Sequence, residues 1–357
     1  MSKLKQLNLP LYVGLFLVLV LVFVSIGGHK IAPYTLEDKL ESEYKMIDGE
    51  GVLLAPPMRP FETTEYLLGT DNFGYDLLTK LLYGAKYTIG IAFAVSILKI
   101  IIGGVIGLYA GTSRKPFTWW SAVENSWSYV PIFLILYFFL RPISFQTSLE
   151  PSQHVTVFIG LTTLLSLPSI VASVRKQTKT ISEMEFIKVA RTLGANRNRI
   201  VWKHIFPQLK EGLLVMFVME IVYVMTVMGQ LGIFHLFIGG TEVQRDPTIY
   251  LSITNEWAGL IGQSRGYIWH DQHILLIPLF ALIFATSSFV LLAKGLQNYF
   301  QTDYQRAPWI PTGQKQSYPL PKKKIKISNR LELQPLEVIF GMYLILFVAG
   351  MFVIFVG

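Results

Sequence analysis

Long apolar runs dominate this sequence and restrict the chain to architectures that a lipid bilayer accepts. A helix needs about 20 mostly apolar residues to cross the hydrocarbon core. Its backbone polar groups are satisfied inside the segment, which favours helices over open sheets. The sequence predicts seven spans: Pro10–Gly28, Tyr87–Ala110, Ala122–Leu140, His154–Val174, Glu211–Phe234, Gln272–Ala293 and Leu336–Phe355.

The composition supports a membrane protein. Of the 357 residues, 52% are apolar and 15% are charged, whereas a soluble domain carries about 25% charged residues. These values exclude a disordered chain, a collagen-like repeat and a nucleic-acid-binding tail. Cysteine is absent, which excludes disulfides, thiol catalysis and cysteine-ligated metal sites. We therefore expect an all-α polytopic membrane protein.

The distribution of basic residues predicts the orientation. With the N-terminus inside, 21 of the 31 Lys and Arg residues fall in inner segments and 8 in outer segments. Positively charged loops favour the cytoplasmic side, so we predict a cytoplasmic N-terminus. The first span has a second interpretation, a signal peptide cleaved near Ser25 and Gly27. Its apolar run, Leu11 to Ile26, slightly exceeds the usual length of about 7–15 residues for a signal-peptide core.

The largest outer segment leads into the second span. Gly69 to Asp71 predicts a turn, in which Thr70 or Asp71 caps the following helix. Four leucines follow at helical spacing, from Leu77 to Leu82. We expect them to form an amphipathic helix that lies on the outer membrane face.

The longest inner segment between two spans covers residues 175–210 and is basic. Ser182 and Glu185 have the spacing of a capping box. Gly194 and Ala195 are expected to break the helix, which resumes from Arg197 to His204, and Pro207 is expected to end the segment. Two interpretations remain open: a helix–Gly–helix element that docks another protein, or a basic loop solvated at lipid headgroups.

Two opposite charges lie deep in the predicted spans. Lys99 is eleven residues from the inner end of the second span, and Glu220 is nine residues into the fifth. At about 1.5 Å per residue, their depths differ by about 3 Å. A charge at mid-membrane costs at least about 2.5 kcal/mol, so each needs a partner or water. We predict that they share one polar site, either as direct partners or as a joint lining of the pathway. The alternative is that each snorkels or is neutralised separately.

Motifs for chemistry are scarce. The sequence contains no G-x-x-x-x-G-K-[ST] and no H-E-x-x-H, so we expect no ATP hydrolysis by this chain. His270 and His273 flank Asp271. This spacing allows part of a metal site, although a polar rim at the membrane surface is the simpler interpretation.

Three stretches resemble the permease subunits of ABC importers of the dipeptide, oligopeptide and nickel type. The first, Gly69–Gly111, begins GTDNFGYD and is similar to the lead-in and membrane helix of that family. The second, Glu185–Leu209, is similar to the cytoplasmic loop that members insert into the ATPase subunit, and it keeps twelve residues between Gly194 and Pro207. The third begins at Glu256 and is similar to the last core helix and its approach.

Several positions depart from the family pattern. Lys188-Val189-Ala190 replaces the usual E-A-A, and Phe206 stands where leucine is common. Tyr75 stands where arginine is common. The chain beyond about residue 300, with its predicted seventh span, is longer than the six-helix plan.

The resemblance implies the type I ABC importer transmembrane fold, with six core helices and an extra C-terminal helix. The expected division of the chain is residues 1–28 as an N-terminal transmembrane helix, 29–84 as an extracytoplasmic segment, 85–300 as the core permease domain with a coupling loop at 182–207, and 301–357 as a basic linker with an additional helix.

The resemblance further implies one half of a translocation pathway for peptides in the cell membrane of a prokaryote. Its implied partners are a second, homologous permease, two cytoplasmic ATPase subunits, an extracytoplasmic binding protein and membrane lipid. ATP and Mg would be bound by the ATPase subunits, so we expect no catalytic residue, cofactor or metal in this chain. The coupling candidates are Glu185, Lys188, Ala190, Arg191, Gly194, Ala195 and Pro207, and the pathway candidates are Lys99 and Glu220.

Other functions remain open at this stage. The solute could be nickel or another small molecule. An ATP-independent transporter and a structural or signalling membrane protein are less favoured. Intramembrane charges are few, and no clear internal repeat is present, unlike many ion-coupled carriers.

Overall fold

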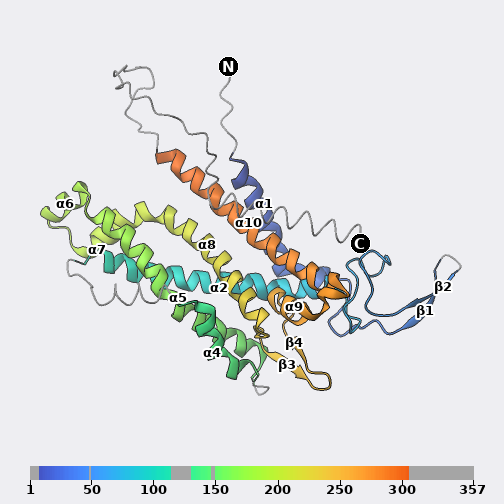
Figure 1. Ribbon diagram of the computed structural model, residues 1–357. Helices are drawn as coiled ribbons and strands as arrows, with labels where there is room; N and C mark the ends of the chain where they lie inside the picture. The colour runs from blue at the N-terminus through green and yellow to red at the C-terminus, as the bar shows by residue number, and fades with distance from the viewer. Residues whose placement is uncertain (1–7, 48–49, 114–129, 146–148, 305–357) are drawn as a thin grey trace, which may run out of the picture.

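The computed structural model describes residues 8–47, 50–113, 130–145 and 149–304. Within these ranges, five helices are long and apolar enough to cross a membrane. They form an elongated helical bundle (Figure 1). Their bounds are α1 Leu9–Ile31, α2 Leu77–Gly111, α5 Pro151–Ser182, α8 Phe206–Ile233 and α10 Gln272–Tyr304.

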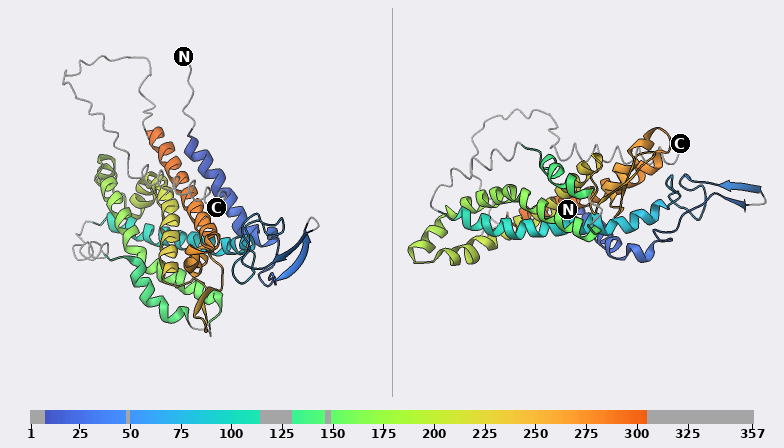
Figure 2. Two further views of the ribbon diagram at one scale, coloured as in Figure 1. Left: turned by 45° about the vertical axis from the view of Figure 1, so that its right-hand side comes forward. Right: turned by 90° about the horizontal axis from the view of Figure 1, so that it is seen from below.

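Shorter elements connect these helices at the two ends of the bundle. The helices are α4 Ile132–Ser144, α6 Glu185–Thr192, α7 Arg197–Arg199 and α9 Trp257–Ser264, with a π-helix at Ile200–Ile205 and a 3₁₀-helix at Arg265–Trp269. Two antiparallel hairpins pair β1 Glu43–Ile47 with β2 Glu50–Leu54, and β3 Thr241–Gln244 with β4 Ile249–Ser252. We call the end that carries α6 and α7 the loop end, and the end that carries the hairpins and α9 the hairpin end (Figure 1). The β1–β2 hairpin projects away from the helices in both views of Figure 2.

The predicted spans agree with the structure where it describes them. The first, second, fourth, fifth and sixth spans lie within or close to α1, α2, α5, α8 and α10, which mostly extend beyond the apolar runs. The third overlaps α4, which is a shorter apolar helix of 13 residues. Part of that span, and the whole seventh span at Leu336–Phe355, lie outside the described residues.

Glycines set the closest helix packing. On α2, Gly103, Gly107 and Gly111 recur every fourth residue, and a Cβ added to each would lie 2.8, 2.7 and 2.5 Å from side-chain atoms of α5. Small residues at this spacing let two backbones approach closely without a hydrophobic driving force. The facing residues are Ile170, Val174 and Thr178, so α2 and α5 run parallel. The chain must therefore return to the hairpin end between these two helices, and α4 forms part of that return.

Glycines also allow α1 to pack closely against the bundle. A Cβ at Gly14 would lie 2.4 Å from the backbone of Leu292, and a Cβ at Gly28 would lie 2.6 Å from the carbonyl oxygen of Leu82. The side chain of Asn8 also donates to the carbonyl of Gly295 at 2.7 Å. The contacts of Asn8 and Gly14 with Gly295 and Leu292 make α1 antiparallel to α10.

The lead-in to α2 differs from the prediction. Leu77 starts one continuous helix of 35 residues rather than a separate helix on the membrane surface. Its cap is Asp76, which accepts a hydrogen bond from the Thr79 N–H at 2.7 Å. Asp71 instead closes its own turn by accepting from the N–H groups of Phe73 and Tyr75, and it pairs with the buried Lys80. The predicted cap at Thr70 or Asp71 is therefore wrong.

A buried carboxyl group ties α9 to the end of α8. Glu256 is 1% exposed and accepts hydrogen bonds from the N–H groups of Ile238, at 2.9 Å, and Gly259. Burial raises the pKa of Glu256 to about 8. This contact fixes the loop that follows α8 at the hairpin end.

We call Gly103, Gly107 and Gly111 the glycine seam, and it gives a first testable prediction. Replacing Gly107 with valine should lower the unfolding temperature of the detergent-solubilised protein, because the new side chain overlaps Val174. Overpacking of this kind costs about 1–3 kcal/mol. Gly104→Val is the matched control, since a Cβ at Gly104 meets nothing within 4 Å. Equal unfolding temperatures for the two variants would contradict the packing.

Candidate functional site

The segment between α5 and α8 forms two short helices around a glycine turn. Gly194 has a φ of +83°, a conformation that glycine adopts without steric cost. A Cβ there would meet nothing within 4 Å, so the backbone angle rather than space sets the requirement for glycine. The predicted break at Gly194 and Ala195 is therefore confirmed. The predicted capping box is wrong, because Ser182 ends α5 and its hydroxyl donates to the carbonyl of Lys179.

One face of α6 is buried and the opposite face is exposed. Ile187 is 0% exposed and belongs to a core cluster with Val201 and Ile205. Leu193, just after α6, is 82% exposed. Exposure of an apolar side chain to water is unfavourable. We call the exposed apolar residues of this segment the loop patch, which consists of Met184, Phe186, Val189 and Leu193. Exposed apolar patches of this kind mark interaction sites.

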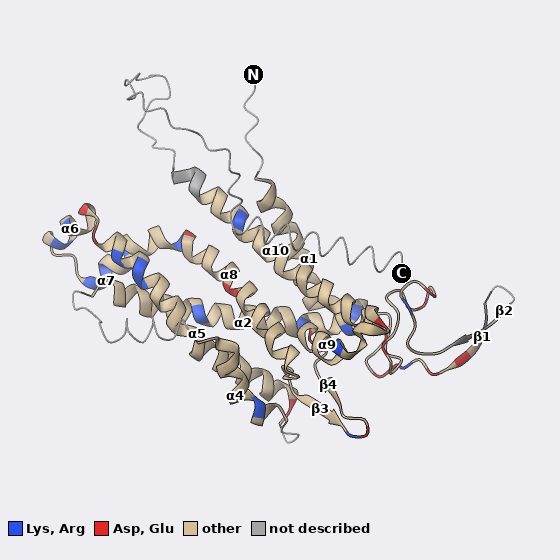
Figure 3. Ribbon diagram, in the orientation of Figure 1, with Lys and Arg blue, Asp and Glu red and all other residues tan. Residues whose placement is uncertain are grey.

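The charged coupling candidates surround the loop patch. Glu185 and Lys188 form an exposed ion pair at 2.7 Å within α6, and such pairs add little stability. Arg191 and Ala195 line a recess of about 330 Å³, together with Thr112. Figure 3 shows the basic residues gathered around α6 and α7 and only few charges along the long helices. The polar groups here frame the loop patch.

The loop is fastened to α2 by contacts that spacing alone did not reveal. Arg197 donates from Nε to the Thr112 hydroxyl at 3.0 Å and from Nη2 to the Tyr109 carbonyl. The Tyr109 hydroxyl contacts Asn198 Oδ1 at 2.6 Å and Trp202 Nε1 at 3.1 Å. The loop is thereby held to the end of α2. The run of polar residues after the glycine turn was the only sequence feature that indicated these contacts, and it did not identify Tyr109 as their partner.

Pro207 does not end the loop as predicted. The helical path is continuous from α7 through the π-helix into α8, and Pro207 lies in the first turn of α8. Proline lacks an N–H group, so the wider π-turn before it accommodates the missing hydrogen bond. The loop and α8 consequently form one continuous element.

The predicted pairing of the two intramembrane charges is present. Lys99 Nζ of α2 and a carboxylate oxygen of Glu220 on α8 form an ion pair. Lys99 is 0% exposed, and its ammonium also lies 4.8 Å from the centre of the Tyr223 ring. Breaking such a buried pair from one side costs about 3–5 kcal/mol. The pair therefore fixes α2 against α8 in the middle of the bundle.

The two histidines near the start of α10 lie in different surroundings. His273 is buried and contacts the Thr70 carbonyl through Nε2 at 3.2 Å, whereas His270 is exposed. No group of three or more metal-ligating side chains occurs among the described residues.

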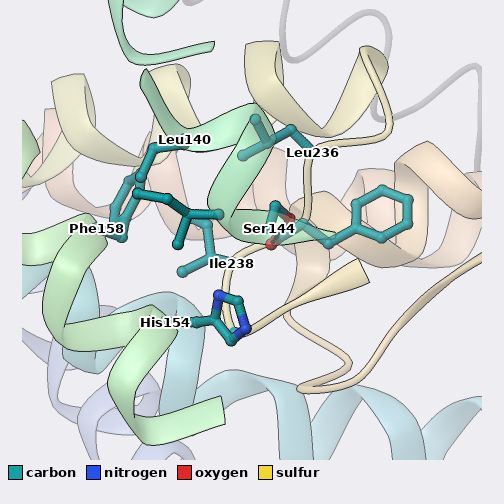
Figure 4. Close-up of a pocket in the computed structure, with 9 residues that line it drawn as sticks. Leu140, Ser144, His154, Phe158, Leu236 and Ile238 are labelled. Carbon is teal, nitrogen blue, oxygen red and sulfur yellow. Dashed lines mark hydrogen bonds between the residues drawn. The ribbon is translucent and has the colours of Figure 1, made fainter. Parts of the chain in front are cut away.

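A small recess lies between α4, α5 and the loop after α8. Leu140, Ser144, His154 and Phe158 line it together with Leu236 and Ile238 (Figure 4). Its cavity volume of about 10 Å³ leaves room for little more than one water molecule, whereas a typical ligand site has about 300–1,000 Å³. We interpret it as a packing defect near the hairpin end.

Comparison with known proteins agrees with this geometry. Residues 103–306 match the family described as "Binding-protein-dependent transport system inner membrane component". The matched region runs from the glycine seam of α2 through the loop patch and the Lys99 partner Glu220 to the end of α10.

Several relatives have similar sequences. A Brucella suis protein named for a peptide transport system permease is 29% identical over 234 residues, which is 66% of this chain and 72% of the relative. The peptide transport system permease protein SapC of Haemophilus influenzae is 23% identical and covers 82% of this chain and 90% of its own length. The di/tripeptide transport system permease protein DppC of Pseudomonas aeruginosa is 24% identical over 80% of this chain and 85% of its own. The chain is thus a multi-pass membrane protein with the type I ABC importer transmembrane fold, and it belongs to the family of binding-protein-dependent transport system inner membrane components.

Proposed function

We propose that this chain is the permease subunit of an ATP-driven importer of peptides and forms half of the translocation pathway. The loop patch carries the coupling part of this proposal, because an exposed apolar surface on a firmly held element fits a docking partner better than water. Peptides are the proposed solute because three relatives carry peptide transport names. ATP with its Mg is bound and hydrolysed by separate subunits.

The assembly we propose has four further components. A second, homologous permease completes the pathway, two cytoplasmic ATPase subunits bind the loop end, and an extracytoplasmic binding protein delivers peptide at the hairpin end. The excess of basic residues in the inner segments supports a cytoplasmic N-terminus and loop end. The parallel course of α2 and α5 is consistent with it, since both helices end beside the loop.

Coupling follows from how the loop is attached. When ATP closes the ATPase pair, the docked loop moves with it, and two connections pass the movement into the membrane. Arg197 holds the end of α2, and the continuous helical path carries the movement into α8. These helices meet at Lys99 and Glu220, so the pair lies where the two connections converge. Switching between two packed arrangements is how such a lever opens alternate sides of a pathway.

The glycine turn supplies a test of docking. Gly194→Val should insert into the membrane normally but lose at least about 10-fold in peptide uptake, because a β-branched residue at positive φ costs about 1–2 kcal/mol or more and reshapes the loop. Gly194→Asn is the control, since asparagine tolerates this conformation. Uptake is measured in vesicles with the assembled complex, and ATPase binding by co-purification. Wild-type uptake and co-purification by Gly194→Val would contradict the coupling role.

The intramembrane pair gives a second test of the proposed function. Lys99→Glu or Glu220→Lys alone should impair assembly or uptake, because each leaves like charges buried together. The double swap should recover part of the loss, since opposite signs face each other again. Lys86→Glu, an exposed charge reversal on the same helix, is the control. A double swap no better than the single variants would argue against direct pairing, as measured by complex yield and uptake rate.

A further inference from the structure

One face of α8 carries polar residues through the membrane. Tyr223, Thr226 and Gln230 follow Glu220 at helical spacing. Tyr223 is 39% exposed, Thr226 is exposed and Gln230 is half-buried. Polar side chains in a span generally face protein or a water-filled cavity rather than lipid. This face therefore fits the lining of the pathway, and it leads to the exposed Phe234 at the hairpin end.

Aromatic rings gather where this face ends. Phe234 stacks on Phe133 at 5.8 Å between ring centres and lies 5.6 Å from Tyr137. The next residue, His235, stacks on Tyr250 of β4 at 4.5 Å, with the rings inclined by 16°. We call this set the ring cluster, which consists of Phe133, Tyr137, Phe145, Phe234, His235 and Tyr250.

Two arginines border the ring cluster. The Arg141 guanidinium lies 5.6 Å from the centre of the Tyr137 ring, and Arg265 donates from Nη1 to the Ile233 carbonyl at 2.7 Å. Both arginines are exposed, and within the described part of the chain neither forms an ion pair with a carboxylate. Burial and the charge of Arg265 lower the pKa of His235, so the arginines supply the positive charge at neutral pH.

Hydrogen bonds in the neighbouring loops hold the ring cluster in place. His235 has a φ of +55°, an uncommon angle for a residue with a side chain. Glu256 holds the Ile238 N–H, and the hydroxyls of Ser144 and Thr241 lie 2.9 Å apart, close to the recess of Figure 4. A surface held this firmly is pre-organised for a ligand, which reduces the entropy lost on binding.

We propose that the ring cluster, with Arg141 and Arg265, binds the C-terminal carboxylate and terminal side chain of a peptide as it enters the pathway. Guanidinium groups bind carboxylates through charge-assisted hydrogen bonds, and the rings offer an apolar surface to the side chain. Their position at the end of the polar face of α8 puts this contact at the mouth of the pathway. The assignment rests on the proposed import of peptides.

Photolabelling of the assembled complex in lipid vesicles tests this site. The probe is a peptide with a photoreactive phenylalanine as its last residue, used with a free carboxylate and with an amidated C-terminus. Labelled residues are identified by mass spectrometry, and uptake of the free peptide is measured in parallel. The variants are Arg141→Gln, which removes a side chain whose described contact is with a ring, and its combination with Arg265→Gln. Arg245→Gln, an exposed arginine between β3 and β4, is the matched control.

We expect the free peptide to label the ring cluster and the amidated peptide to label it weakly. Arg141→Gln should reduce labelling by about 10-fold, because it removes a charge-assisted hydrogen bond to the carboxylate, while Arg245→Gln should leave labelling unchanged. Labelling elsewhere, or equal labelling of wild type and variants, would overturn the assignment. Unchanged labelling with weaker capture of the binding protein would overturn it in favour of a protein-docking surface. Ring-cluster labelling without ATP-dependent uptake by the wild type would instead reject the import function and retain the site.

Discussion

Close contact between α2 and α5 through three glycines is the constraint on which the other features depend. It sets the two helices parallel and brings their ends together beside the loop. Because lipid offers no hydrophobic force between helices, such contact relies on van der Waals packing along a side-chain-free surface. The same helix α2 then meets α1 at Leu82, α8 at Lys99 and the loop at Tyr109, so its position determines the whole bundle.

Two kinds of polar contact are used at different depths. At the loop end, Arg197 and Tyr109 make several hydrogen bonds in a partly exposed setting, where each contributes little alone but together they fix the loop. In the middle of the bundle, Lys99 and Glu220 form one pair in an apolar setting, where losing either partner is costly. The first arrangement suits a joint that must transmit movement, and the second suits a contact that favours discrete helix arrangements.

Features that follow from a single segment could be predicted, whereas most contacts between distant segments could not. The spans follow from hydropathy along single segments. The Lys99–Glu220 pair joins positions 121 residues apart and follows from opposite charges at matching depth in the second and fifth spans. Asp71 and Asp76 are equally suited by residue type to cap a helix. Asp71 accepts hydrogen bonds within its own turn, and Asp76 caps α2. The ring cluster joins residues from α4, the end of α8 and β4, and the Arg197–Tyr109 contact joins positions 88 residues apart, so no local pattern marks either.

The central claim is that the loop patch docks on a cytoplasmic ATPase subunit. The native chain has no cysteine, so a single cysteine at Leu193, the most exposed apolar residue of the loop patch, can carry a photo-crosslinker. A single cysteine at Ser42 marks the opposite side. The account predicts that Leu193→Cys crosslinks to a P-loop ATPase and is shielded from an impermeant reagent in intact cells, whereas Ser42→Cys reacts with that reagent and forms no such crosslink. Labelling of Leu193→Cys from outside, or its failure to crosslink in an assembled complex, would contradict the account.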